Sequence, residues 1–143
     1  MGDKTEAFEF DLVPIYIESA LEAELYDFIV THTEYLERMR KLGRRVVVPD
    51  QRELQIDLDN KEQAAQFKGR FLGFLKIYYD EAKITRKARS ANGGWHITVR
   101  MPFDMSPAER IAWQLALGSD PVREILGLLR WRAGTKDCTF FTE

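Results

Sequence analysis

The fold is decided by residues 53–101, which read ELQIDLDNKEQAAQFKGRFLGFLKIYYDEAKITRKARSANGGWHITVRM. Side chains alternate at its start, so that Leu54, Ile56 and Leu58 share one face of a strand. The spacing then becomes helical, and the stretch ends in two strand-like runs joined at Gly93-Gly94, a pair that tolerates positive φ in a turn. The predicted elements are a strand at 53–58, a helix at 61–80, and strands at 83–89 and 95–101.

The flanking sequence extends this order at both ends. Before the stretch we predict a helix at 18–42 that stops at Gly43 and a strand at 45–48, joined to the next strand by a hairpin turn at 49–51. After it we predict a helix starting at Ser106 and stopping near Gly118, a second from Asp120-Pro121 to about Arg132, and a short strand at 138–142. The core-facing stripe of the 61–80 helix is predicted as Ala64, Phe67, Phe71, Phe74 or Leu75, and Tyr78.

Without the first helix and strand, the order is β-α-β-β-α-β. This is the RRM-like or ferredoxin-like pattern of an α+β fold, an antiparallel sheet with helices on one face. The length of 143 residues is that of one domain. We therefore expect a single domain at 1–143, in which residues 1–44 are a helical extension of an α+β core at 45–143.

Composition limits the class of protein. Hydrophobic residues make up 45% and charged residues 31%, which excludes a disordered chain. No apolar run reaches the ~20 residues of a membrane-spanning helix, so we expect no membrane partner. The single cysteine, Cys138, excludes an internal disulfide and favours the cytoplasm. Because the net charge is −2, nucleic-acid binding requires a local basic patch.

The first candidate site is the tetrapeptide Ile56-Asp57-Leu58-Asp59. Carboxylates two residues apart on a strand point the same way, and their oxygens suit a hard divalent cation. Together with nucleotide phosphates, such pairs build phosphoryl-transfer sites. The structural alternative makes Asp59 the cap of the next helix, with Glu62 three residues on, and leaves Asp57 facing solvent.

The second candidate site is the turn from Ser90 to His96. Gly93 and Gly94 let the backbone approach a ligand closely. The imidazole of His96 can donate a hydrogen bond to a phosphate. The alternative is an ordinary glycine hairpin followed by a half-buried histidine.

Two further features of the sequence are polar. Arg86 and Arg100 lie on the two strands of the predicted hairpin and can face one groove that binds phosphates. The alternative is solubilising charge on an edge strand. The corner at residues 117–121, followed by Arg123, is interpreted as a helix–helix junction with Asp120 as the cap.

Together, the first two sites resemble the catalytic pattern of archaeo-eukaryotic primases, primase-polymerases and the polymerase domain of bacterial end-joining ligases. That pattern has a hydrophobic-Asp-hydrophobic-Asp strand, a Ser-x-His type motif entering a strand, and a third acid on a late strand. Residues 56–59 resemble the first part, and residues 90–96 resemble a longer form of the second. The late strand corresponds to Thr139-Phe140-Phe141. The third acid is then Glu143, Asp137 or absent.

The resemblance covers residues 45–143. It implies nucleotidyl transfer on a nucleic-acid template, with Mg²⁺ or Mn²⁺ bound by Asp57, Asp59 and Glu143. It also implies that His96 contacts the phosphates of the incoming nucleoside triphosphate, and that Ser90 and the glycines shape that pocket. The implied partners are single-stranded or primed nucleic acid and a replication protein, as for a small phage-type replication factor in a host cytoplasm. A homodimer is a further option.

Three other functions stay open: a metal-free RRM-like nucleic-acid-binding module, a protein-interaction domain and a metal-dependent nuclease. The enzyme predicts that Asp57, Asp59 and His96 converge in one cleft. In the enzyme, the template strand is expected to cross the open face of the sheet, where Trp95 or Tyr78 stacks a base. The binding module predicts an exposed basic and aromatic face without convergent acids. The interaction domain predicts an exposed apolar patch away from the acids.

Overall fold

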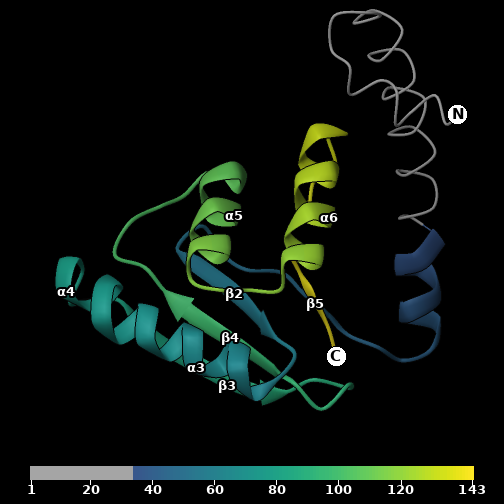
Figure 1. Cartoon of the computed structure of the whole chain (residues 1–143). Coiled ribbons are helices and arrows are strands. Elements are labelled where there is room, and N and C mark those ends of the chain that lie inside the picture. The colour runs from purple at the N-terminus through teal and green to yellow at the C-terminus, as the bar shows by residue number, and fades with distance from the viewer. Residues whose placement is uncertain (1–33) are drawn as a thin grey trace, which may run out of the picture.

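The structure, a computed structural model, describes residues 34–143 of the chain (Figure 1). Residues 34–41 are helical, and the part of the predicted first helix at 18–33 lies outside the described residues. Gly43 ends this helix as predicted. Its φ of 80° suits glycine, and its backbone N–H donates to the carbonyl of Arg40 at 3.0 Å.

A three-stranded antiparallel sheet forms the centre of the fold. Its strands are β2 (Glu53–Leu58), β3 (Lys83–Arg89) and β4 (Trp95–Arg100), in the spatial order β2-β4-β3. The three predicted strands are confirmed to within one residue. The register pairs Asp57 with His96 and Leu58 with Trp95. Residues paired directly across two strands point to the same face, so Asp57 and His96 share one face of the sheet. Because neighbouring residues on a strand point to opposite faces, Leu58 and Trp95 share the other face.

The opposite, apolar face packs on the helix that follows β2. This helix runs through α3 (Lys61–Arg70), a π-helical turn η1 (Phe71–Leu75) and α4 (Lys76–Tyr78), close to the predicted span. Phe67, Phe71 and Leu75 are buried in the core with the apolar residues of the sheet. The prediction that Tyr78 faces the core is wrong, since it is 80% exposed. The π turn shifts the register of the last turn, so the buried stripe ends at Leu75.

Two more helices lie along the outer edge of β2. They are α5 (Pro107–Ala116) and α6 (Pro121–Arg132), and the side chains of Ser106 and Asp120 cap them as predicted. No helix within residues 34–143 is long and apolar enough to cross a membrane.

The remaining strands do not join the central sheet. β1 (Val46–Val47) and β5 (Phe141–Thr142) pair antiparallel as a separate two-stranded sheet, here called the β1–β5 ribbon. The predicted hairpin between 45–48 and 53–58 is therefore wrong. The α+β class with antiparallel sheets is confirmed, but the specific RRM-like order is not.

The outer edge of β2 explains why no fourth strand from residues 34–143 joins the sheet. Side chains from α5 and the corner before α6 occupy its hydrogen-bonding positions: Gln114 Oε1 accepts from the N–H of Gln55 at 2.8 Å, and Ser119 Oγ accepts from the N–H of Asp57 at 3.0 Å. The carbonyl of Asp57 accepts from the N–H of Asp120 at 2.8 Å. Because these groups already have partners, β5 pairs with β1 instead.

The β1–β5 ribbon crosses the polar face of the central sheet. The side-chain amide of Gln55 donates to the carbonyl of Val47 at 2.9 Å, and the Phe141 ring stacks on His96 with centroids 3.9 Å apart. Gln55, His96 and Thr98 are consequently buried. The open sheet face that a template strand was expected to cross is covered at these residues.

Candidate functional site

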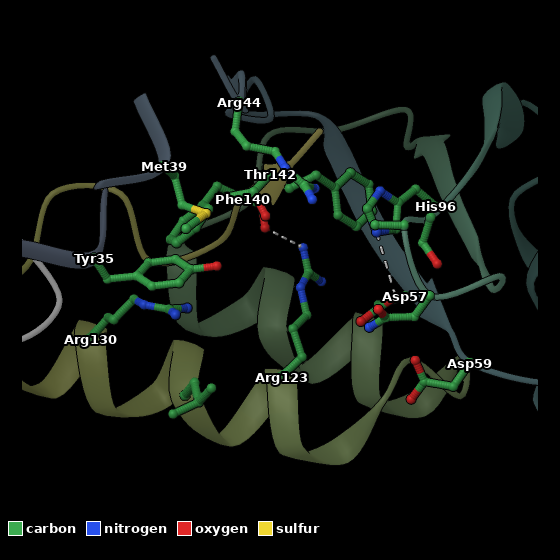
Figure 2. Close-up of a pocket in the computed structure, with 15 residues that line it drawn as sticks. Tyr35, Met39, Arg44, Asp57, Asp59, His96, Arg123, Arg130, Phe140 and Thr142 are labelled. Atoms are coloured by element: carbon green, nitrogen blue, oxygen red, sulfur yellow. Dashed lines mark hydrogen bonds and ion pairs between the residues drawn. The ribbon is translucent and has the colours of Figure 1, made fainter. Parts of the chain in front are cut away.

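A cleft of about 580 Å³ lies where the polar face of the sheet meets α6 and the β1–β5 ribbon. Figure 2 shows Asp57, Asp59 and His96 toward one end, Tyr35 and Arg130 at the other, and Arg123 between them. The residues that line the cleft are Tyr35, Met39, Arg44, Asp57, Asp59, Ser90, Ala91, Asn92, His96, Arg123, Leu126, Arg130, Phe140, Phe141 and Thr142. The predicted convergence of Asp57, Asp59 and His96 in one cleft is therefore met.

Asp57 and Asp59 reach the cleft from the end of β2 and the residue just beyond it. Burial raises the pKa of the Asp57 carboxyl, and the negative charges of Asp59 and Asp120 raise it further against the opposing charge of Arg123. Burial and the charge of Asp120 also raise the pKa of Asp59. The helix cap proposed for Asp59 belongs instead to Asn60, whose side chain accepts from the N–H of Gln63 at 2.9 Å.

His96 lies between two carboxylates, one at each ring nitrogen. Its Nε2 is 3.7 Å from Asp57 Oδ1, on the cleft side. Its Nδ1 is 3.1 Å from Glu143 Oε2. The Phe141 ring lies parallel to the imidazole, with an interplanar angle of 0°. The ring is therefore held by stacking on one face and by a hydrogen bond at Nδ1, while Nε2 faces the Asp57 carboxylate.

Glu143 is clamped by Arg86 through two parallel hydrogen bonds. Arg86 Nη1 donates to Oε2 at 2.8 Å, and Arg86 Nη2 donates to Oε1 at 2.6 Å. These bonds, with that from His96, lower the pKa of Glu143 to about 2. Arg45 Nη2 lies 3.6 Å from Oε1 as well. Both carboxylate oxygens therefore already have cationic or donor partners.

The predicted three-acid metal site is not met in the structure. Within residues 34–143, no three His, Cys, Asp or Glu side chains form a group that could hold a metal ion. Glu143 lies on the other side of the His96 ring from Asp57, and Asp137 does not line the cleft. The pair Asp57 and Asp59 still fits a Mg²⁺-like ion, because such ions need only one or two carboxylates when substrate phosphates supply the other oxygens.

The glycine turn closes one side of the cleft. Ser90 lines the cleft, and its Oγ accepts from the N–H of Gly94 at 2.9 Å, which tightens the turn. Gly93 has a φ of 84°. A Cβ on Gly94 would lie 2.2 Å from the carbonyl oxygen of Leu58, so this glycine permits a close approach between backbones rather than to a ligand. Neither glycine itself lines the cleft.

The two arginines predicted for phosphate binding lie outside the cleft. Arg86 is held by Glu143, and Arg100 Nη1 donates to the exposed Asp50 at 2.9 Å. Trp95 points to the apolar face, where the guanidinium of Arg89 lies 4.3 Å from its ring centroid. The prediction that Arg86 and Arg100 bind the nucleotide in this cleft is therefore not met.

The arginines that do line the cleft are Arg44, Arg123 and Arg130. Arg123 donates to the carbonyl of Phe140 and to Gln55 Oε1, each at 3.1 Å. The guanidinium of Arg130 lies 4.6 Å from the Phe140 ring, and burial lowers its pKa to about 10. The sequence offered one signal for Arg123, its position in the first turn of the helix after Asp120, but helix capping accounted for that corner.

A buried polar network holds the base of the cleft. Glu124 is 1% exposed and accepts from Gln114 Nε2 at 2.7 Å, from Ser119 Oγ at 2.8 Å and from Arg123 Nη1 at 2.8 Å. Through Ser119, this network reaches the backbone N–H of Asp57. The residue pattern at the corner therefore fixes the strand that carries the acid pair.

The comparisons with known proteins add no relative. No protein-family model matches the chain, and neither the curated proteins nor the solved structures contain a match. A function for the cleft is therefore argued from its chemistry.

Proposed function

We propose that the cleft binds a nucleoside triphosphate with a divalent cation and that the chain carries out primase-polymerase-like nucleotidyl transfer on a nucleic-acid template. The observation that carries this proposal is the convergence of Asp57, Asp59 and His96 on one cleft that arginines also line. Carboxylates alone would repel a triphosphate. A site with acids at one end and arginines beside them suits a metal–triphosphate complex.

The acid pair supports this reading through its electrostatics. Asp57 and Asp59 are near enough for the charge of Asp59 to raise the pKa of Asp57. A bound cation relieves that repulsion and the cost of burying the carboxylates. Mg²⁺ or Mn²⁺ on Asp57 and Asp59 would supply charge neutralisation for the transferring phosphoryl group.

The other residues of the cleft position the substrate. Arg44 is exposed at the cleft and offers a guanidinium to phosphate oxygens, while Arg123 adds buried positive charge. His96 presents Nε2 to the cleft, beside Asp57. In the transfer, a 3′ hydroxyl oxygen bonds to the α-phosphorus, the bond to the β-phosphate breaks, and pyrophosphate leaves while the hydroxyl proton passes to solvent.

A second candidate function is a non-catalytic protein-interaction domain. It is favoured by an exposed apolar patch on the helix that follows β2, away from the acid pair. The residues of this patch are Phe74, Ile77 and Tyr78, each more than half exposed and at the i, i+3 and i+4 spacing of one helix face. Exposed patches of this kind mark interaction surfaces.

The test is a calorimetric titration of the protein with Mn²⁺, with a nucleoside triphosphate, and with both. The expected result is saturable triphosphate binding that requires Mn²⁺ and is lost in the Asp57→Ala/Asp59→Ala variant. The matched control is Asp80→Ala/Glu81→Ala, which removes the same charge from exposed positions outside the cleft. Primer extension with the same variants then tests transfer itself.

Two outcomes would count against the enzyme. A folded wild-type protein that binds neither ligand excludes the metal–triphosphate site. Equal binding by the wild type and the Asp57→Ala/Asp59→Ala variant places the ligand elsewhere. In either case the apolar patch becomes the leading candidate, to be tested by partner capture with a Phe74→Glu/Tyr78→Glu variant as the comparison.

A further inference from the structure

We infer that Glu143 is a positioning residue: clamped by Arg86, it holds His96 so that Nε2 faces Asp57 and the cleft, and it does not ligate the metal. The inference rests on the proposed function for what His96 touches. It assigns Glu143 a role different from the third metal ligand that the primase resemblance implies.

Most hydrogen-bond acceptor positions on Glu143 are already occupied. Oε1 accepts from Arg86 Nη2 at 2.6 Å, and Oε2 accepts from Arg86 Nη1 at 2.8 Å and lies 3.1 Å from His96 Nδ1. A bidentate arginine–carboxylate pair is among the strongest polar contacts between side chains. Three of about four acceptor positions are thus taken, and a cation at the remaining position on Oε1 would be repelled by the Arg45 guanidinium, 3.6 Å from that oxygen.

The contact with Glu143 also sets the orientation of the His96 imidazole. A hydrogen bond at one ring nitrogen decides the state of the other. Because Glu143 is ionised, it acts only as an acceptor and places a proton on Nδ1. Nδ1 is then engaged by Glu143, and Nε2 is the ring nitrogen that faces Asp57 and a ligand in the cleft. Nε2 donates to an oxygen there only when it also carries a proton. The stacked ring of Phe141 keeps the imidazole from turning about its bond to the chain.

Glu143 is itself held at both its backbone and its carboxylate. Its backbone N–H donates to the carbonyl of Arg45 at 2.8 Å, and its carbonyl accepts from the N–H of Arg45 at 2.6 Å. The β1–β5 ribbon thus places the Glu143 backbone over the polar face of the sheet, while Arg86 of β3 fixes the carboxylate. Each end of the residue is anchored by a different element, as expected of a residue that orients another.

The experiment measures the His96 ring and the metal separately. In a His32→Gln background, which leaves one histidine, ¹⁵N–¹H correlation spectra report which ring nitrogen carries a proton at a fixed pH. Mn²⁺ binding without nucleotide is followed by electron paramagnetic resonance. Triphosphate binding is followed by calorimetry. The variants are Glu143→Ala, Arg86→Met and Asp57→Ala/Asp59→Ala.

We expect Glu143 to affect the His96 ring, and Asp57 and Asp59 to affect Mn²⁺ binding. Glu143→Ala and Arg86→Met each change the His96 Nδ1 signal and weaken triphosphate binding about tenfold or more, as for outer-shell partners. Both leave the affinity for Mn²⁺ alone unchanged, whereas Asp57→Ala/Asp59→Ala removes it. Arg86→Met keeps the test decisive if Glu143→Ala does not fold.

Two results would overturn the inference. One is a loss of Mn²⁺ affinity in Glu143→Ala comparable to that in Asp57→Ala/Asp59→Ala, which would make Glu143 a ligand. The other is a His96 spectrum that neither variant alters. Failure of the proposed function looks different: neither Mn²⁺ nor triphosphate binds the wild type, while the His96 signal still depends on Glu143 and Arg86.

Discussion

The two carboxylates that flank His96 lie in contrasting surroundings. Asp57 faces the cleft, and burial with neighbouring negative charge raises its pKa. Glu143 faces Arg86, whose two hydrogen bonds help to lower its pKa to about 2. A carboxylate that no arginine clamps is available to a ligand, whereas one in a bidentate arginine pair is part of the scaffold. The side chains around each acid, rather than its place in a motif, decide which role it takes.

Replacing the arginine near each acid is expected to give the largest difference in the free energy of unfolding. The Arg123 side chain is 14% exposed and joins the buried Glu124 network, while Arg86 is 37% exposed and pairs with Glu143. We expect Arg123→Ala to lower the free energy of unfolding by about 3–5 kcal/mol, since it leaves Glu124 buried and unpaired. Arg86→Ala should cost less, about 1–2 kcal/mol, because its bidentate pair with Glu143 is partly exposed to solvent. Urea denaturation measures both, and equal costs would contradict the contrast.

Substituting the acids themselves should have effects of opposite sign. Asp57→Asn removes a buried charge that is repelled by Asp59 and Asp120, so we expect it to stabilise the fold by about 0.5–2 kcal/mol at pH 7. Glu143→Gln removes the charge that pairs with Arg86, so we expect it to lower the free energy of unfolding. Thermal denaturation without metal compares the two variants. A destabilised Asp57→Asn would show that the carboxylate is already compensated.

The smallest expected effect is on the pH dependence of stability. Glu143 has a folded-state pKa of about 2, below its ordinary value of 4.5. Its contribution is therefore complete above pH 4.5 and is lost as the pH falls toward 2. The difference in unfolding free energy between wild type and Glu143→Gln should shrink over that interval. A difference that stays constant down to pH 2 would mean that Arg86 does not hold the carboxylate.

Local patterns in the sequence predicted most of the elements. Alternation located β2, glycines located the β3–β4 turn, and the Ser106 and Asp120 caps located α5 and α6. These signals depend on neighbours along the chain. The convergence of Asp57, Asp59 and His96 was expected from the primase resemblance rather than from local pattern, because β2 and β4 pair without a hairpin between them.

The errors came from contacts between residues far apart in the sequence. The place of β5 depends on Gln114 and Ser119, which occupy the edge of β2 some 60 residues away, at separations of 59 and 62. No short sequence motif predicts that a glutamine side chain will take the hydrogen-bonding position of a neighbouring strand. The partner of Glu143 is likewise 57 residues away in Arg86. Roles set by such partners require the tertiary structure.

The occupied edge of β2 has a consequence for association between copies of the chain. An open edge strand is a template for pairing with another strand, and this pairing leads to aggregation. At the β2 edge, the side chains of Gln114 and Ser119 accept hydrogen bonds from two backbone N–H groups of the strand. On the other side, β3 exposes Lys83, Lys87 and Arg89. A strand from a second copy would find the backbone donors of β2 already hydrogen-bonded, and at β3 it would meet positive charges like its own. Both edges therefore disfavour extension of the sheet by another copy of the chain.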